Sequence, residues 1–329
     1  MTLERKIAAD FDRPAGSVTI GKSMSGGIIF EGVGLPGRTV DIAATTDLIL
    51  GAIERNIDHI TLPVRETPAT VTVTDSSLLD AGIREVVTVG ESDFSGSPVN
   101  RRYNIGVGIA RFNGTLIQRN SDFSFDKILG RVDQTTGYRK ELVIKGERTE
   151  PDYGGGLCQI STTAYRGVWE YGFPILKRKN HSFAVHYYGP QGTDATVYPP
   201  NIDMQFRNDG PGALLIQTYI EGSKAYFVYY GTRDTRSTEL IGPYMWGHKD
   251  PPPPRTELTI EIPPGETKKV GSPVPGVHAL WYRVVHQNGK EHTEPVASIY
   301  EARPLYTLIG VRPEELPASA SGSIVPTEP

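Results

Sequence analysis

Residues 154–171, which read GGGLCQISTTAYRGVWEY, decide how the centre of this chain folds. After the three glycines, apolar side chains recur three or four residues apart, at Leu157, Ile160, Ala164, Val168 and Tyr171. This spacing keeps them on one face of an α-helix. The sequence therefore predicts a helix over residues 157–171 that begins directly after a glycine turn.

The chain has one cysteine, Cys158, and it lies in the first turn of this predicted helix. Unpaired N–H groups give a helix N-terminus partial positive charge, which favours the nucleophilic thiolate over the thiol. We expect Gly154, Gly155, Gly156 and Gln159 to contact substrate, with the glycine N–H groups stabilising an oxyanion. The alternative is that Cys158 packs in a core and the glycines only form a turn.

A cysteine nucleophile needs a base, and His181 and Asp194 follow downstream. We predict that each begins a strand, and that two adjacent antiparallel strands bring imidazole and carboxylate together. Cys158, His181 and Asp194 would then be the nucleophile, base and orienting acid of a triad. His186 is the rival base, but strand alternation points it away from His181.

Other site types fit the same residues less well. The opposite directions expected for the two histidines, and the lack of a second thiol, argue against a zinc site. The glycine run lacks the Gly-Lys-Ser/Thr ending of a phosphate-binding loop. We therefore expect no metal and no cofactor. Arg101 and Arg102, near the start of another predicted helix, could hold a carboxylate or simply form a solvated face.

Composition narrows the class of protein. The 329 residues carry a net charge of −4, with 38% hydrophobic and 22% charged residues, as in ordinary globular proteins. There is no basic cluster interleaved with aromatics, so we expect no nucleic-acid partner. No run of about 20 apolar residues predicts a membrane span. If the protein is exported, its signal or anchor lies upstream or has been removed.

The pattern along the chain predicts a multi-domain α+β protein. Helices are expected over 41–56 and 99–112, the first capped by Thr45 or Thr46, and strands over 60–64, 71–73, 182–188, 195–198 and 202–206. Strands 214–220 and 225–230 flank a hairpin turn. Four prolines at 251–254 suggest a linker, followed by strands only. The predicted divisions are 1–88, an α+β module; 89–235, the central domain; 236–256, a linker; 257–312, a β module; and 313–329, a flexible tail.

The central segment resembles the VanW family over about residues 89–232. The residues that carry the resemblance are the 100–114 segment, Phe123-Ser124-Phe125, residues 154–163, His181-Ser182, Asp194-Ala195-Thr196-Val197 and Phe206-Arg207-Asn208. The resemblance implies an envelope protein, in a family associated with vancomycin-resistance clusters, and assigns no catalytic residues. Residues 1–88 resemble a peptidoglycan-binding module, and the segment after the prolines resembles the β-rich G-five module.

Two functions follow as expectations. The first is an extracellular or envelope enzyme whose Cys158 performs hydrolysis or transpeptidation on cell-wall peptides. The second is a module that binds peptidoglycan or an envelope partner without chemistry. A sulfur that is accessible and close to an imidazole favours the enzyme, whereas a sulfur buried among apolar side chains favours the binder.

Overall fold

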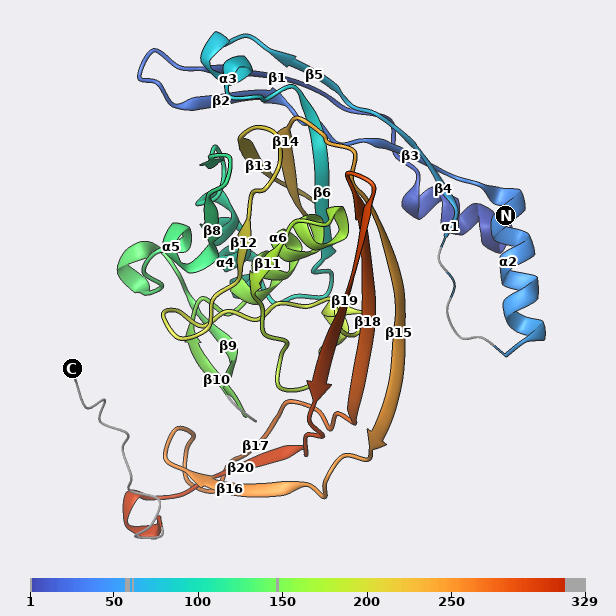
Figure 1. The fold of residues 1–329 in the computed structure, drawn as a ribbon. Coiled ribbons are helices and arrows are strands. Elements are labelled where there is room, and N and C mark those ends of the chain that lie inside the picture. The colour runs from blue at the N-terminus through green and yellow to red at the C-terminus, as the bar shows by residue number, and fades with distance from the viewer. Residues whose placement is uncertain (1, 57–59, 61, 146–147, 317–329) are drawn as a thin grey trace.

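The structure, a computed structural model, describes residues 2–56, 60, 62–145 and 148–316. The class is α+β, as predicted, with helices packed on several largely antiparallel sheets (Figure 1). Six α-helices lie in the described residues: α1 (Leu3–Phe11), α2 (Ile42–Glu54), α3 (Ser76–Asp80), α4 (Val99–Ala110), α5 (Phe125–Leu129) and α6 (Leu157–Tyr171). No helix within these ranges is long and apolar enough to cross a membrane.

A four-stranded antiparallel sheet forms the centre of the molecule. Its order is β6 (Glu85–Asp93), β14 (Lys224–Gly231), β13 (Leu214–Glu221) and β7 (Leu116–Ile117). The predicted hairpin is confirmed, since β13 pairs with β14 from Leu215↔Tyr230 to Glu221↔Lys224. Gly222 makes the turn with a φ of +58°, a conformation that favours glycine.

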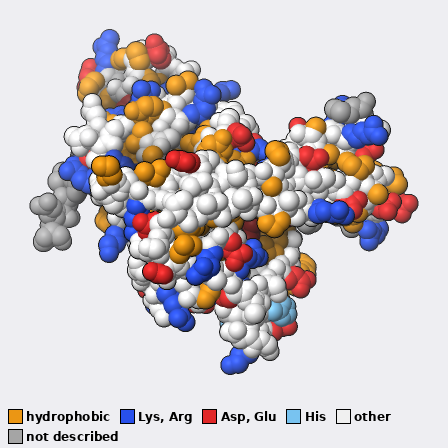
Figure 2. All heavy atoms as spheres, turned by 90° about the horizontal axis from the view of Figure 1, so that it is seen from above, with side chains coloured by type: hydrophobic (Ala, Val, Ile, Leu, Met, Phe, Trp, Pro, Cys, Tyr) orange, Lys and Arg blue, Asp and Glu red, His pale blue; other side chains and the backbone are white. Residues whose placement is uncertain are grey.

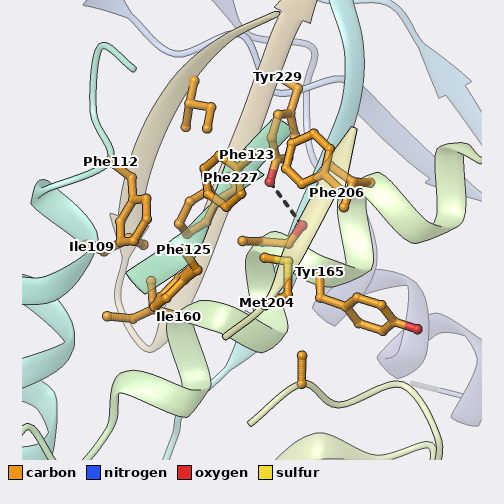
Figure 3. Close-up of a cluster of buried hydrophobic side chains, with 14 of the residues drawn as sticks. Ile109, Phe112, Phe123, Phe125, Ile160, Tyr165, Met204, Phe206, Phe227 and Tyr229 are labelled. Atoms are coloured by element: carbon orange, nitrogen blue, oxygen red, sulfur yellow. Dashed lines mark hydrogen bonds between the residues drawn. The ribbon is translucent and has the colours of Figure 1, made fainter. Parts of the chain in front are cut away.

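Strand β14 is buried on both of its faces. Side chains alternate across a strand. On one face Phe227 and Tyr229 join a core with the aromatic side chains of Phe112, Phe123 and Phe206 (Figure 3). On the other face lies a second core, which contains Tyr226, Val228 and Tyr230. The central sheet therefore sits between two apolar layers.

Helix α6 covers the first of these faces, and its bounds are those predicted from the sequence. It lies unusually close to β6, because a Cβ on Gly90 would lie only 1.9 Å from the Thr163 carbonyl oxygen. The Tyr229 hydroxyl also donates a 3.0 Å hydrogen bond to the Ala164 carbonyl. These contacts fix the helix on the sheet and so fix the position of its first turn.

The N-terminal residues cover the second face. The sheet β2 (Ile28–Gly32), β1 (Ser17–Lys22), β5 (Thr70–Val73) contributes Val18 and Ile20 to the second core, and β3 (Gly37–Val40) pairs with β4 (Val64–Thr67). Strand β6 begins at Glu85, so the predicted boundary between residues 88 and 89 falls inside a strand.

Helix α2 matches the predicted helix over 41–56, with a different cap. The Asp41 side chain, rather than Thr45 or Thr46, accepts the Ala44 N–H at 3.0 Å. Leu48 and Ile53 of this helix are exposed. The predicted strand over 71–73 lies within β5. The strand predicted over 60–64 is shifted, because β4 begins at Val64.

The chain before and after the prolines belongs to one sheet. Strand β15 (Ser237–Lys249) occupies most of the expected linker 236–256 and pairs with β18 (Gly276–Gln287), which pairs with β19 (Lys290–Tyr300). Trp281 of β18 meets Trp169 of α6 edge-on, with 5.9 Å between ring centroids. The prolines at 251–254 are thus a connection within a continuously packed structure.

Smaller sheets complete the fold. Strands β16 (Arg255–Thr259), β20 (Tyr306–Gly310) and β17 (Thr267–Val270) form one sheet, and β11 (Ile175–Lys177), β12 (Gln205–Arg207) and β8 (Asp122–Ser124) form another. β9 (Lys140–Lys145) and β10 (Arg148–Tyr153) form a hairpin. Residues 123–138 contain part of β8, α5 and the short 3₁₀ helix at Gln134–Thr136.

Charges are mixed on the face seen in Figure 2, where basic and acidic side chains are interspersed. That face therefore carries no extended field of one sign.

Candidate active site

Cys158 is the second residue of α6, directly behind the glycine turn. Gly154 and Gly156 have φ values of +83° and +115°, which side chains with a Cβ rarely adopt. A Cβ on Gly156 would also lie 3.0 Å from Ile105 Cγ1. The glycines are therefore needed for the turn that starts α6 and sets the position of the cysteine.

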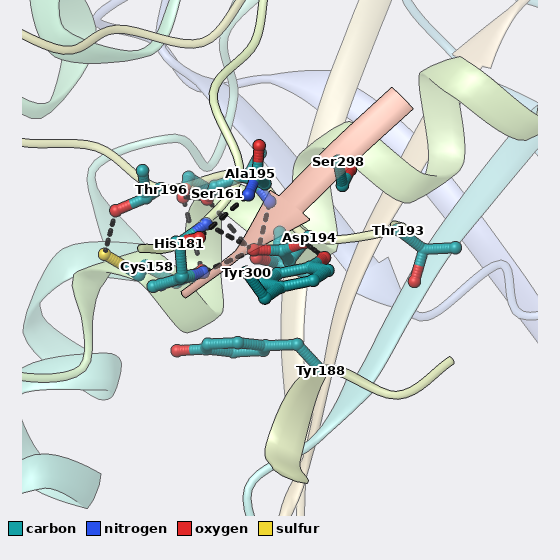
Figure 4. Close-up of polar contacts among 12 residues, drawn as sticks. Cys158, Ser161, His181, Tyr188, Thr193, Asp194, Ala195, Thr196, Ser298 and Tyr300 are labelled. Atoms are coloured by element: carbon teal, nitrogen blue, oxygen red, sulfur yellow. Dashed lines mark hydrogen bonds and ion pairs between the residues drawn. The ribbon is translucent and has the colours of Figure 1, made fainter. Parts of the chain in front are cut away.

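His181 and Asp194 come together, although not on strands. The Nδ1 atom of His181 lies 2.5 Å from Asp194 Oδ2, and the same oxygen accepts the backbone N–H of His181 at 2.8 Å (Figure 4). Both residues lie on irregular loops between β11 and β12, so the strands predicted over 182–188 and 195–198 are wrong. In these loops side chains, rather than a neighbouring strand, take the hydrogen bonds of the backbone. For example, the Thr162 hydroxyl accepts the Ala195 N–H at 3.1 Å.

The sulfur of Cys158 faces this pair. It lies 3.3 Å from the Thr196 hydroxyl and 3.6 Å from the Val197 carbonyl oxygen, and the His181 side chain is close enough to lower its pKa. Because Nδ1 of His181 is hydrogen-bonded to Asp194, the other ring nitrogen, Nε2, is the one available to interact with the sulfur. The three residues are therefore arranged in the order thiol, imidazole and carboxylate.

Electrostatics favour the charged forms of all three groups. Burial by itself raises the pKa of the Cys158 thiol, but the hydrogen bond and charge of His181 outweigh it, and the pKa falls to about 7. Burial opposes the charge on His181 too, yet Asp194 and Cys158 raise its pKa to about 9. His181 and Arg178 hold the pKa of Asp194 well below its usual range, against the effect of its burial. Between about pH 7 and pH 9 the pair is therefore mainly a thiolate beside an imidazolium.

A further set of residues holds the imidazole and the carboxylate. The Tyr188 ring stacks on His181, with 4.6 Å between centroids and 18° between planes. The Tyr300 hydroxyl, from β19, donates to Asp194 Oδ1, and Arg178 Nη2 lies 3.3 Å from the same oxygen. Sequence reasoning missed Tyr300, because no local pattern links a residue of β19 to Asp194.

Cys158 and His181 line a cavity of about 890 Å³. Gly154, Gly156 and the Tyr153 side chain line it too, whereas Gly155 and Gln159 are not among its lining residues. Gln159 is fully buried behind the wall, where its amide donates to the Asp93 carbonyl at 3.2 Å. Gly155 and Gln159 therefore lie behind the cavity wall, and their contact with a substrate stays a prediction.

His186 lies outside this arrangement. It is exposed, belongs to the 3₁₀ helix His186–Tyr188, and packs against the neighbouring Tyr187 ring with 3.9 Å between centroids. Within the described residues, no group of three or more His, Cys, Asp or Glu side chains is placed to hold a metal ion.

Comparisons with known proteins point to one family. The profile described as "VanW like protein" matches residues 100–230. The uncharacterized protein YoaR of Bacillus subtilis is 31% identical over 140 residues, which are 42% of this chain and 46% of that protein. The vancomycin B-type resistance protein VanW of Enterococcus faecalis is 28% identical over 115 residues, which are 33% of this chain and 42% of that protein.

The chain thus spans less than half the length of these two relatives. The matched region contains Cys158, His181 and Asp194, whereas Tyr300 lies outside it. Residues 100–230 of this chain form a VanW family domain.

Proposed function

We propose that this protein is a cell-envelope enzyme in which Cys158, His181 and Asp194 catalyse acyl transfer or hydrolysis on cell-wall peptides. One observation carries the proposal: a thiol and an imidazole from separate segments line one cavity, and a buried carboxylate is hydrogen-bonded to that imidazole. A cysteine that served only for packing would need neither a hydrogen-bonded histidine nor an adjacent cavity.

The chemistry would proceed in two stages. The Cys158 thiolate attacks the carbonyl carbon of an amide and forms a carbon–sulfur bond, and the carbonyl oxygen takes up the negative charge. The carbon–nitrogen bond then breaks, and imidazolium His181 gives its proton to the leaving amine. In the second stage His181 removes a proton from water or an acceptor amine. That nucleophile displaces the thiolate, which gives hydrolysis or transpeptidation.

The first turn of α6 supports stabilisation of the oxyanion. The N–H groups of Leu157 and Gln159 bond to the carbonyls of Gly154 and Gly156, both at 3.0 Å. Among the described backbone hydrogen bonds, none involves the N–H of Cys158. That group lies at the positive end of the helix, where it can donate to an oxyanion formed on the attacked carbon.

The substrate class and location rest on the family. The matched relative that is named as a vancomycin resistance protein supports a role at the cell wall. The resemblance of residues 1–88 to a peptidoglycan-binding module, and of the segment behind the prolines to a G-five module, remain predictions in keeping with such a location.

Incubation of the purified protein with peptidoglycan fragments tests the proposal. Mass spectrometry should find cleaved or cross-linked peptides, together with a thioester on Cys158 when the reaction is quenched in acid. Cys158→Ser is the matched control and should give neither. Binding of the fragments without either product, at every pH between about 6 and 9, would instead favour the non-catalytic binding module.

A further inference from the structure

Arg101 of α4 is a buried cation that lines the same cavity as Cys158. Only 9% of its surface is exposed. Its guanidinium carbon lies 4.4 Å from the centre of the Tyr187 ring, another residue of the cavity lining. A charge in such a position costs free energy unless an opposite charge accompanies it.

The partners of Arg101 in the structure are all neutral. Nη1 donates to Ser97 Oγ at 2.5 Å, and Nη2 donates to Gln159 Oε1 at 2.8 Å and to the Tyr188 hydroxyl at 3.3 Å. The ion pairs among the described residues include none with Arg101. These bonds fix the direction of the guanidinium and leave its charge uncompensated.

Three other arginines with buried side chains differ in this respect. Arg178 lies 3.3 Å from Asp194, Arg236 lies 2.8 Å from both Asp209 and Asp234, and Arg283 lies 2.5 Å from Glu294. Each of these charges is matched by a carboxylate of the protein itself. Arg101 lines the cavity that Cys158 also lines, where a carboxylate from outside could take that place.

Tyr188 connects Arg101 to the triad. Its hydroxyl accepts from Arg101, and its ring stacks on His181. The guanidinium is therefore separated from the catalytic imidazole by one aromatic side chain. A planar guanidinium held in one orientation is well suited to a carboxylate, which it can bind through two parallel hydrogen bonds.

We propose that Arg101 binds a carboxylate of the substrate, so that the acyl compound presented to Cys158 is an anion, such as a peptide with a free carboxyl group. This inference rests on the proposed function, since it names the class of compound that Cys158 attacks. It differs from a purely structural role, in which Arg101 would only tie α4 to α6 through Gln159 and to the residues before α4 through Ser97.

Two small alkylating agents test the inference without knowledge of the natural substrate. Iodoacetate carries a carboxylate, and iodoacetamide is its neutral counterpart. The ratio of their rates at Cys158 reports how strongly the site attracts a carboxylate beside the sulfur. We expect Arg101→Gln to lower this ratio roughly tenfold, the loss of one charge-assisted hydrogen bond. Arg102→Gln, which removes the same charge from an exposed neighbour, should leave it unchanged.

An unchanged ratio in Arg101→Gln, with its iodoacetamide rate preserved, would overturn the inference. If that variant fails to fold, the inference can be tested on the native protein by measuring how well small compounds protect Cys158 from alkylation. N-acetylalanine should slow the reaction of Cys158 with iodoacetamide, and N-acetylalaninamide should not; equal effects of the two overturn the carboxylate site. If the native protein cleaves peptidoglycan fragments and Arg101→Gln leaves the ratio of the two alkylation rates unchanged, only this inference is overturned. If Arg101→Gln lowers that ratio but the native protein cleaves no peptidoglycan fragment, only the catalytic proposal is overturned.

Discussion

Replacement of His181 by Gln is the sharpest test of the site, because glutamine keeps a hydrogen-bonding side chain and cannot become a cation. In the native site the charge and hydrogen bond of His181 bring the pKa of Cys158 from an ordinary 9.0 to about 7. Without an imidazolium, burial is the largest remaining influence, and it raises the thiol pKa. We therefore expect the pKa of Cys158 in His181→Gln to return to about 9 or above.

The size of the effect follows from two opposing factors. At about pH 6, a rise of about two pH units in thiol pKa lowers the thiolate fraction roughly a hundredfold. A thiolate of higher pKa is intrinsically more reactive, by roughly tenfold over two units for a Brønsted slope near 0.5. The net expectation is a rate of alkylation about tenfold lower at pH 6, and equal or higher above about pH 10.

Stopped-flow alkylation with iodoacetamide across this pH range measures the two profiles. The native protein should show a rise with an apparent pKa near 7 and a further change near 9, where the imidazolium loses its proton. His186→Gln, at an exposed histidine outside the cavity, is the matched control and should reproduce the native profile. Superimposable profiles for His181→Gln and the native protein would refute the ion pair.

Three further changes have defined outcomes. Tyr300→Phe removes a donor to buried Asp194, and we expect urea unfolding to report a loss of about 1–3 kcal/mol. Burial and the charge of Asp203 raise the pKa of Asp126 to about 7, so ionisation of Asp126 destabilises the fold as the pH rises. We therefore expect Asp126→Asn to raise the free energy of unfolding by about 1–2 kcal/mol at pH 8 and by little at pH 4. Gly156→Ala places a Cβ where φ is +115°, and thermal unfolding should show a loss of about 2–4 kcal/mol.

What the sequence predicts well here is local. Helix α6 is set by a spacing that repeats within fifteen residues, and the β13–β14 hairpin by a turn between two alternating runs. The strands predicted around His181 are wrong because their backbone hydrogen bonds depend on residues far away in the sequence. A short apolar run does not show that the side chains of Asp194 and Thr162 accept these backbone N–H groups in place of a neighbouring strand.

Long-range contacts lie beyond such reasoning. In the sequence Arg101 could either hold a carboxylate or belong to a solvated helix face, and nothing local decides between the two. The residue is buried because α4 meets α6 and the 3₁₀ helix His186–Tyr188. Likewise, the prolines at 251–254 break the local pattern and suggest a linker, although strand pairing resumes across them. Proline restricts the backbone where it stands and carries no information about which strands pair on either side.

The site also depends on residues beyond the matched family region. Residues 100–230 contain the three reacting groups, but Asp194 is held in place partly by the Tyr300 hydroxyl. The next residue in the chain, Glu301, donates its N–H to the Ser182 carbonyl at 2.7 Å, beside His181. Trp281 covers Trp169 on the helix that carries Cys158. The strands behind the prolines therefore act as a support for the triad, and we expect its geometry to require the chain up to β19 and not the family region alone.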